Sequence, residues 1–332
     1  MKKRQVAFLI AKVAFAAAVL FWLFQKVDAH RVWITMRDAH RAPIFVGLAL
    51  CWLTIILAAW RWHRLLRVFD IAIPLKSLFC IVQIGQFFAM FLPGPTGDDL
   101  TRMLYISRLA PGRVGESCST VLLDRCIGLT GLFLFALICI PWQWALLTAS
   151  SQTYWLAVTI MGGGTFVAIG GAVFFLAGHP THRWFERRLR SRPAHTLRDE
   201  AARIWGLFCD NKNVIGQVIA VAVITQLVNC VLFYLAGAAV GIELPFLTWL
   251  SFVPIVLAAS ALPISVAGIG VREYLLVLFL GVIGGVESER ALAASFVAFS
   301  IILTVCVLGG LLYIFYRPKQ KLTAPAEAPV PV

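Results

Sequence analysis

The sequence predicts an all-α polytopic membrane protein with about six full spans and two re-entrant broken hairpins arranged as an inverted repeat. Three observations predict this fold class. The 332 residues are 60% hydrophobic and 14% charged, whereas soluble domains are about 25% charged. Several apolar runs are long enough to cross a bilayer, and two others break at proline and glycine. The composition therefore excludes an ordinary soluble domain.

The first broken run is residues 77–92, which carry no charge. Its 16 residues reach about 24 Å at about 1.5 Å each, which is short of the roughly 30 Å hydrocarbon core. Helix-breaking residues end the run and ionisable side chains follow: Pro93, Gly94, Pro95 and Gly97, then Asp98, Asp99 and Arg102. We expect this segment to enter the membrane and turn back, with residues 100–109 as the returning arm.

A second break lies about 170 residues later, in the uncharged run 244–271. Pro254 interrupts this run, and its end repeats the pattern of breaking residues followed by charges: Pro263, Gly268 and Gly270, then Arg272 and Glu273. Residues 274–286 form the expected returning arm. Broken helices at matching places in two halves are typical of secondary transporters, and they indicate where the substrate site lies.

The other apolar runs predict six full spans: Val6–Phe24, Pro43–Trp60, Cys118–Ile140, Tyr154–Ala177, Asn213–Val240 and Ala291–Phe315. The first run has a basic start but no clear cleavage site before Gln25, so we expect it to remain as a span rather than leave as a signal peptide. Residues 26–42 mix charged and apolar side chains, as an interfacial amphipathic segment does.

We expect one integral membrane domain over residues 1–316, with repeat halves at about 43–140 and 213–315, a basic loop at 178–212 and a disordered tail at 317–332. If both broken segments are re-entrant, 21 of the 29 Lys and Arg residues lie on one side and five on the other. Cytoplasmic loops carry the excess of basic residues. We therefore predict a protein of the cytoplasmic membrane with both termini in the cytoplasm and with hairpins that enter from opposite sides.

The net charge of +13 arises from basic residues in short stretches between apolar runs. This distribution favours membrane lipids with anionic head groups, and not nucleic acid, as partners. The eight cysteines form no C-x-x-C pair and are expected to be packing residues. His179 and His182 have no third ligand nearby, and Pro180 argues against a helix there, so we predict a solvated loop, no metal site and no cofactor.

Three motifs resemble the membrane domain of lysylphosphatidylglycerol synthases and their stand-alone, flippase-like relatives: Leu92-Pro93 with Gly97-Asp98 and Arg102, then Asp124-Arg125, then Leu262-Pro263 with Gly268-Ile269-Gly270-Val271-Arg272-Glu273. The resemblance covers nearly the whole chain and implies a role in lipid export. The family commonly has Gly-Glu at Gly97-Asp98, so the acid here is one methylene shorter. Because about 16 residues follow the last span, we expect neither an aminoacyl-transfer domain nor the glycosyltransferase domain of other relatives.

The first break is the strongest candidate for substrate binding. Asp98, Asp99 and Arg102 place both signs of charge beside a break in a membrane helix. Ionisable groups at membrane depth are costly and usually face a cavity or one another. These residues therefore either hold the ammonium or phosphate of a head group or, if the break lies at the surface, are simply solvated.

Two adjacent charge pairs are further candidates. Asp124-Arg125, at the entry of the third predicted full span, either faces the same cavity or forms ion pairs that fix the span against the hairpin. Arg272-Glu273 follows the second break, where Arg272 binds a lipid phosphate beside freed backbone amides or the two residues form a structural pair at the outer interface.

Lipid translocation is the function that these features favour: a polar head crosses between the hairpins while the tail stays in lipid. The lipid is expected to be anionic, aminoacylated, glycosylated or terpenoid. No Walker loop or Ser-His-Asp order is present, so we assign no catalytic residue and do not expect an enzyme. The alternatives are an intramembrane lipid-modifying enzyme with Asp98 or Asp99 as base or metal ligand, and a regulatory subunit whose basic loop docks on an envelope-lipid synthesis enzyme.

Overall fold

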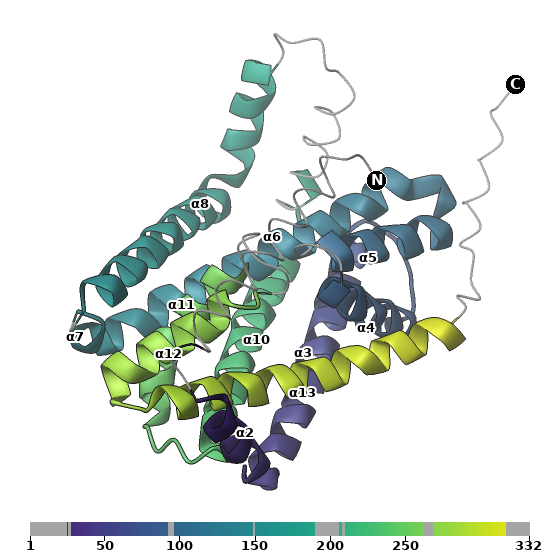
Figure 1. Cartoon of the computed structure of the whole chain (residues 1–332). Helices are drawn as coiled ribbons and strands as arrows, with labels where there is room; N and C mark the ends of the chain where they lie inside the picture. The colour runs from purple at the N-terminus through teal and green to yellow at the C-terminus, as the bar shows by residue number, and fades with distance from the viewer. Residues whose placement is uncertain are drawn as a thin grey trace, which may run out of the picture.

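The fold is known from a computed structural model that describes residues 25, 28–91, 96–148, 150–189, 206–207, 210–261 and 268–316. All regular structure in these ranges is helical (Figure 1). Within the described residues, five segments are long and apolar enough to cross a membrane: α3 (Arg41–Val68), Pro111–Trp142 around α6 (Val114–Cys139), the first part of α8 (Ser151–Leu189), α10 (Lys212–Ala239) and α13 (Ser288–Phe315). The predicted all-helical, multi-pass membrane class is confirmed.

Each broken segment forms two short helices in place of one span. The first gives α4 (Leu75–Phe91) and α5 (Thr96–Leu109), and the second gives α11 (Phe246–Ala261) and α12 (Val271–Gly284). Gly97 lies in the first turn of α5, and Gly268 and Gly270 lie in the turn before α12. The span Val6–Phe24 and the tail 317–332 fall outside the described ranges. So do the other predicted break residues, which are Pro93, Gly94, Pro95 and Pro263. Re-entrance itself stays a prediction.

The two halves contain the same series of helices. α3 and α10 each have 28 residues, α4 and α11 have 17 and 16, α5 and α12 have 14 each, and α6 and α13 have 26 and 28. α3 and α10 run antiparallel, because the His40 amide donates to the Ala239 carbonyl at one end and Arg64 donates to Gln217 at the other. These observations support the predicted inverted repeat.

The turn that ends the first helix of each half is also repeated. The Ile71 amide donates to the Leu66 carbonyl after α3, and the Ile242 amide donates to the Gly237 carbonyl after α10. Both closures are the six-residue hydrogen bond of a Schellman-type helix end, which requires a residue in the left-handed region. The halves therefore share their backbone conformation at this point, 171 residues apart.

The left-handed residue differs between the halves. Gly241 has φ 77° after α10, and Asp70 has φ 53° after α3. Asp70 is the sole non-glycine residue with positive φ in the described ranges. Glycine takes this conformation at no steric cost, whereas a side chain makes it less favourable. The first half therefore keeps the turn at some cost in stability.

Packing between the halves forms the core. α3 packs along α10, α4 packs on α13, and α11 packs on α6. Small residues permit close approach: a Cβ added to Gly131 of α6 would lie 2.5 Å from the Ala222 Cβ of α10. Two large buried side chains, Trp62 of α3 and Trp249 of α11, fill the interior. The two halves therefore share one core, in which α4 of the first half packs on α13 of the second, and α11 of the second half packs on α6 of the first.

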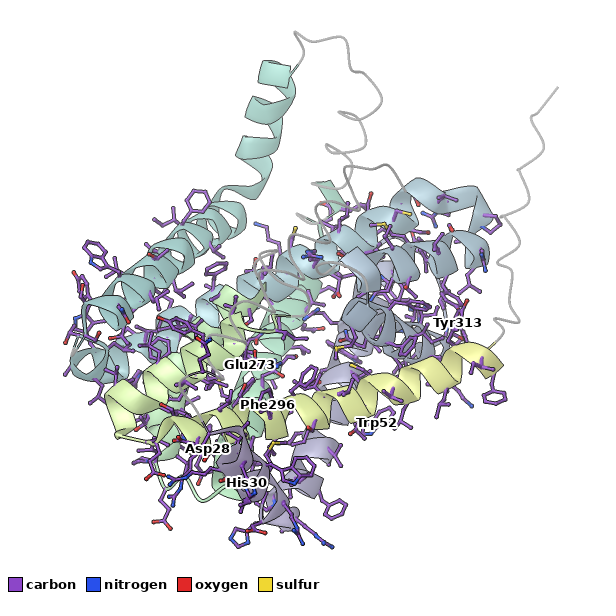
Figure 2. All side chains as sticks on the ribbon, in the orientation of Figure 1. Asp28, His30, Trp52, Glu273, Phe296 and Tyr313 are labelled. Carbon is purple, nitrogen blue, oxygen red and sulfur yellow. The ribbon has the colours of Figure 1, made fainter. Side chains whose placement is uncertain are left out.

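A short helix lies against the second half. α2 (Ala29–Arg37) lies within the predicted interfacial segment and packs on α13, with Val32 buried and Trp33 exposed. Its N-cap is Asp28, whose Oδ1 accepts the His30 and Arg31 amides at 2.8 and 3.4 Å (Figure 2). These two bonds lower the pKa of Asp28, because they favour the charged carboxylate.

Three predicted boundaries are wrong. α3 continues past Trp60 to Val68, α8 runs through Pro180 to Leu189, and α11 passes through Pro254. Neither proline marks a helix end here. Pro254 lies in an apolar helix, where neighbouring groups can satisfy the freed backbone. α8 therefore supplies residues 178–189 of the predicted basic loop as helix. Arg61, the first charged residue of α3 past Trp60, has a partner inside the protein, described below.

Candidate functional site

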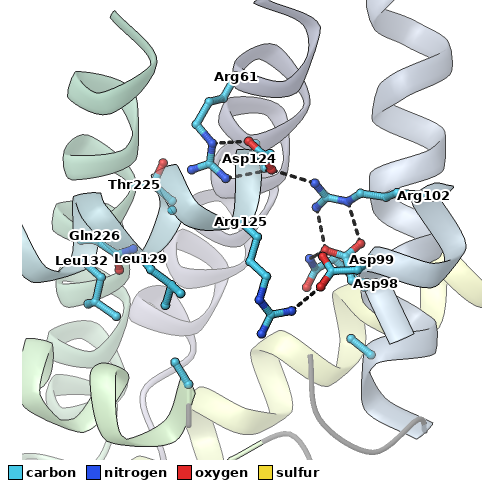
Figure 3. Close-up of a pocket in the computed structure, with 15 residues that line it drawn as sticks. Arg61, Asp98, Asp99, Arg102, Asp124, Arg125, Leu129, Leu132, Thr225 and Gln226 are labelled. Carbon is cyan, nitrogen blue, oxygen red and sulfur yellow. Dashed lines mark hydrogen bonds and ion pairs between the residues drawn. The ribbon is translucent and has the colours of Figure 1, made fainter. Parts of the chain in front are cut away.

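A cavity of about 370 Å³ lies beside the first break. Its wall contains residues of α3, α4, α5 and α6 from the first half and of α10 and α11 from the second. Six ionisable side chains face it, three acids and three arginines (Figure 3): Arg61, Asp98, Asp99, Arg102, Asp124 and Arg125. The formal charge of the wall is therefore balanced.

Four of the six charges form a continuous chain of ion pairs across three helices. Arg102 holds Asp98 side-on, with Nε at 2.8 Å from Oδ1 and Nη2 at 2.7 Å from Oδ2. Its Nη1 donates to Asp124 Oδ2 at 2.9 Å, and Arg61 donates to the same carboxylate from Nε at 2.5 Å and Nη2 at 3.1 Å. The chain therefore joins α3, α6 and α5.

Burial makes these pairs strongly interdependent. The side chains of Arg61, Arg102 and Asp124 are 9%, 5% and 4% exposed, and that of Asp98 is 17% exposed. Removal of one partner from a buried pair leaves an uncompensated charge and costs about 3–5 kcal/mol. The alternative in which the charges after the break are simply solvated does not describe these residues.

The local sequence explains how Asp98 reaches this place. Asp98 and Arg102 are four residues apart and thus share one face of α5. Asp98 also lies in the first turn of α5, where the helix dipole favours a negative charge. Opposite it, a Cβ at Gly85 of α4 would overlap Asp98 Oδ1, and a Cβ at Gly97 would lie 2.5 Å from the Phe88 carbonyl oxygen. Both glycines therefore let α4 and α5 approach closely.

The remaining two charges form a separate pair. Arg125 Nη1 donates to Asp99 Oδ2, linking α6 to α5. The Arg125 side chain is 31% exposed and that of Asp99 is 16% exposed. Adjacent residues on a helix point about 100° apart, so Arg125 and Asp124 reach different partners: Asp99 for Arg125, and Arg61 and Arg102 for Asp124. Arg125 is the most exposed of the six charged side chains.

The charges of the second half lie elsewhere. Arg272 and Glu273 are buried, and neither lines this cavity. Glu273 Oε2 accepts the Gly270 amide at 2.6 Å, and its Oε1 accepts Arg272 Nη2 at 2.5 Å and the Ser295 hydroxyl at 3.3 Å. The Arg272 guanidinium also lies 4.9 Å from the centre of the Phe299 ring. These contacts cap the N-terminus of α12 and hold it against α13.

A model of the lysylphosphatidylglycerol synthase TM region matches residues 9–310. The chain belongs to this family. The matched range includes every helix that lines the cavity, and it confirms the resemblance given by the three motifs. No curated protein matches the chain significantly.

Five of the seven charged residues that the sequence singles out as site candidates meet in one cavity: Asp98, Asp99, Arg102, Asp124 and Arg125. Asp124 and Arg125 have the geometry of both alternatives, and their role in substrate binding stays a prediction. Each residue lines the cavity, and each forms an ion pair with α5 that fixes α6 against the first hairpin. A substrate-binding role for Arg272-Glu273 stays a prediction, and the contacts of that pair favour a structural role.

Sequence reasoning missed Arg61, Thr225 and Gln226, which also line the cavity. Arg61 looks like the first charge after a span, yet its partner Asp124 is 63 residues away in the sequence. The signal for Gln226 is a polar side chain in the middle of an uncharged run. Among the residues that the structure describes, no group of His, Cys, Asp and Glu is arranged to hold a metal ion.

Proposed function

We propose that this protein is a lipid translocator, which moves the polar head of a lipid across the membrane while the tail stays among other lipids. The cavity carries this proposal, since its charged wall in the first half faces uncharged residues of α10 and α11. Ionisable groups in membrane segments are expensive and usually mark substrate pathways. Membership of a membrane family associated with lipids supports the same function.

The proposed route is alternating access between two inverted halves. The equal order of helices, the antiparallel α3 and α10 and the repeated turn support this architecture. In such proteins one bundle rocks against the other around a site near their interface. With α4–α5 and α11–α12 as re-entrant hairpins, the cavity would open to one side at a time. The movement would be passive, ion-coupled or driven by a partner.

Reconstitution in vesicles tests the proposal. The full chain is placed in vesicles that contain lipids labelled on the head group, and the label in the outer leaflet is quenched chemically. Translocation exposes label from the inner leaflet, so quenching exceeds the half seen in protein-free vesicles. Asp38→Asn, at an exposed position after α2, should behave like the wild type. No movement of any anionic, aminoacylated, glycosylated or terpenoid lipid, beside an active control protein, would refute the function.

We further propose that the protein is not an enzyme. Asp98 and Asp99 are the acids that an intramembrane lipid-modifying reaction would use, and each accepts hydrogen bonds from an arginine. Both carboxylates therefore already accept hydrogen bonds, which leaves fewer of their lone pairs for the proton of a substrate. Lipid extracts of cells with and without the chain distinguish the two functions. A new lipid species would identify an enzyme, whereas a translocator changes only the distribution between leaflets.

The proposed orientation has both termini in the cytoplasm, with the protein in the cytoplasmic membrane. The excess of basic residues in the segments between spans supports it. Reporter domains fused after Tyr316 and inserted in the 178–212 segment should both be active in a cytoplasmic assay. Activity of either fusion only on the outer side would reverse the assignment. The same segment is the proposed docking surface for a lipid-biosynthesis enzyme.

A further inference from the structure

The six charges of the cavity differ in their availability to a ligand. Arg61, Arg102, Asp98 and Asp124 form one buried chain, in which each carboxylate receives at least two hydrogen bonds from arginine. A ligand that bound there would have to leave a buried charge without its partner, which is strongly unfavourable. The buried chain is therefore a clamp that holds α3, α5 and α6 together.

The remaining pair, Arg125 with Asp99, has the opposite character. One guanidinium nitrogen of Arg125 contacts one carboxylate oxygen of Asp99, and both side chains are partly exposed to the cavity. Asp99 is as exposed as Asp98, but it has a single contact with its arginine, whereas Arg102 holds Asp98 through two contacts. A competing anion can therefore replace the Asp99 carboxylate at a lower cost than a carboxylate of the buried chain. Arg125 remains anchored on α6, and the adjacent clamp keeps that part of α6 in place through Asp124.

The other wall supplies a hydrogen-bond donor that suits an anion. Gln226 of α10 lines the same cavity as Arg125 (Figure 3). Its carbonyl oxygen accepts a hydrogen bond from Asn229 Nδ2 at 3.2 Å, which orients the carboxamide and leaves its NH2 group as the end for a ligand. A guanidinium from the first half and an amide from the second thus line the same cavity, and both are donors to an anion.

We propose that Asp99 is a displaceable counter-ion for Arg125, and that the phosphate of a lipid head group takes its place in the cavity. Guanidinium groups bind phosphate through two parallel hydrogen bonds and remain charged inside proteins. Phosphate binding replaces a contact within the first half by one that also reaches α10 of the second half. The lipid class is accordingly a phosphate-bearing one. This inference rests on the proposed function, because it takes the cavity as the head-group site.

A binding measurement on the full chain in detergent tests the inference without any transport step. The probes are dioctanoyl phosphatidate, inorganic phosphate and, as the uncharged control, dioctanoylglycerol, each titrated by calorimetry. Because Asp99 competes with the ligand, Asp99→Asn should bind phosphatidate about two- to fivefold more tightly than the wild type. Arg125→Gln should weaken binding at least tenfold, and Arg125→Lys by less. Weaker or unchanged affinity in Asp99→Asn would overturn the inference.

The double variant separates displacement from a general change in charge. If Asp99 acts through Arg125, then Asp99→Asn should have no effect on affinity in the Arg125→Gln background. An equal gain in both backgrounds would overturn the inference, since any removal of a negative charge near the cavity would then suffice. Asp38→Asn, which is exposed and distant in sequence, is the matched control and should bind phosphatidate like the wild type.

The probes also identify the source of the phosphate. Tighter binding of phosphatidate than of inorganic phosphate supports a lipid head group, and equal binding supports the same anion site with free phosphate as its ligand. Equal binding of phosphatidate and dioctanoylglycerol would overturn the inference. Lipid translocation without phosphate binding would refute this inference but not the proposed function. Phosphate binding without lipid translocation would refute the proposed function but not the phosphate site.

Discussion

The charged groups after the two breaks occupy matching positions but are used differently. Asp98 is the third residue of α5, and Glu273 is the third residue of α12. Asp98 joins a chain of ion pairs that reaches α6 and α3 and faces a cavity. Glu273 instead binds the adjacent Arg272, the Gly270 amide and a hydroxyl on α13. Asp98 thus belongs to a candidate site, whereas Glu273 has only local contacts that hold the start of α12.

The largest expected effect comes from the centre of the first group. Asp124→Asn removes the carboxylate that Arg61 contacts and leaves Arg102 with Asp98 alone. Because both arginines are buried, the substitution should lower the free energy of unfolding by about 3–5 kcal/mol. Thermal unfolding of the purified protein measures the loss, with Asp38→Asn as control. A melting temperature equal to that of the wild type would show that the chain of pairs does not hold the three helices together.

Substitution of Glu273, the counterpart of Asp98 in the second half, should lower the stability of the protein but leave its affinity for phosphatidate unchanged. Glu273→Gln retains an oxygen for the Gly270 amide but leaves Arg272 without a countercharge, so unfolding should become easier by about 2–3 kcal/mol. Phosphatidate affinity of the folded fraction should stay within twofold. Should stability be unchanged and translocation lost, the second group would be a substrate site after all, and the contrast between the halves would disappear.

A smaller effect is expected at the contact between α4 and α5. In Gly85→Ala the new methyl group overlaps the Asp98 carboxylate, which Arg102 holds rigidly, so we expect a loss of about 1–2 kcal/mol. Gly170→Ala is the matched control, because a Cβ at Gly170 meets nothing within 4 Å. That control should be neutral or slightly stabilising. Equal melting temperatures for the two variants would show that Asp98 is not constrained by α4.

The smallest effect concerns the repeated turn. Asp70→Gly should stabilise the protein by about 0.5–1 kcal/mol, since it relieves the left-handed conformation of a residue with a side chain. Gly241→Asp should destabilise the equivalent turn by a similar amount. Thermal unfolding of both variants checks the sign. Changes of the same sign would mean that the two turns are not equivalent, which would weaken the inverted repeat.

Apolar run length determined the helices, since α3, α6, α8, α10 and α13 all overlap predicted spans. The two breaks were also visible in the sequence, because proline, glycine and charge interrupt runs too short to cross a bilayer. Helix ends were less certain. The sequence predicts interruptions at Pro180 and Pro254, yet both lie inside helices. In the apolar α11, backbone groups freed by proline can be satisfied by neighbours that the local sequence does not reveal.

The sequence by itself determined the membrane class, the paired breaks, the family and most of the charged residues that line the cavity. Only the tertiary structure decided how those charges are paired. Arg61 and Asp124 are 63 residues apart, and Arg125 and Asp99 are 26 apart, so nothing local joins them. Pairing depends on which faces of α3, α5 and α6 meet after packing. That meeting separates a buried clamp from the partly exposed Arg125, while the charges after the second break contact only one another and their close neighbours.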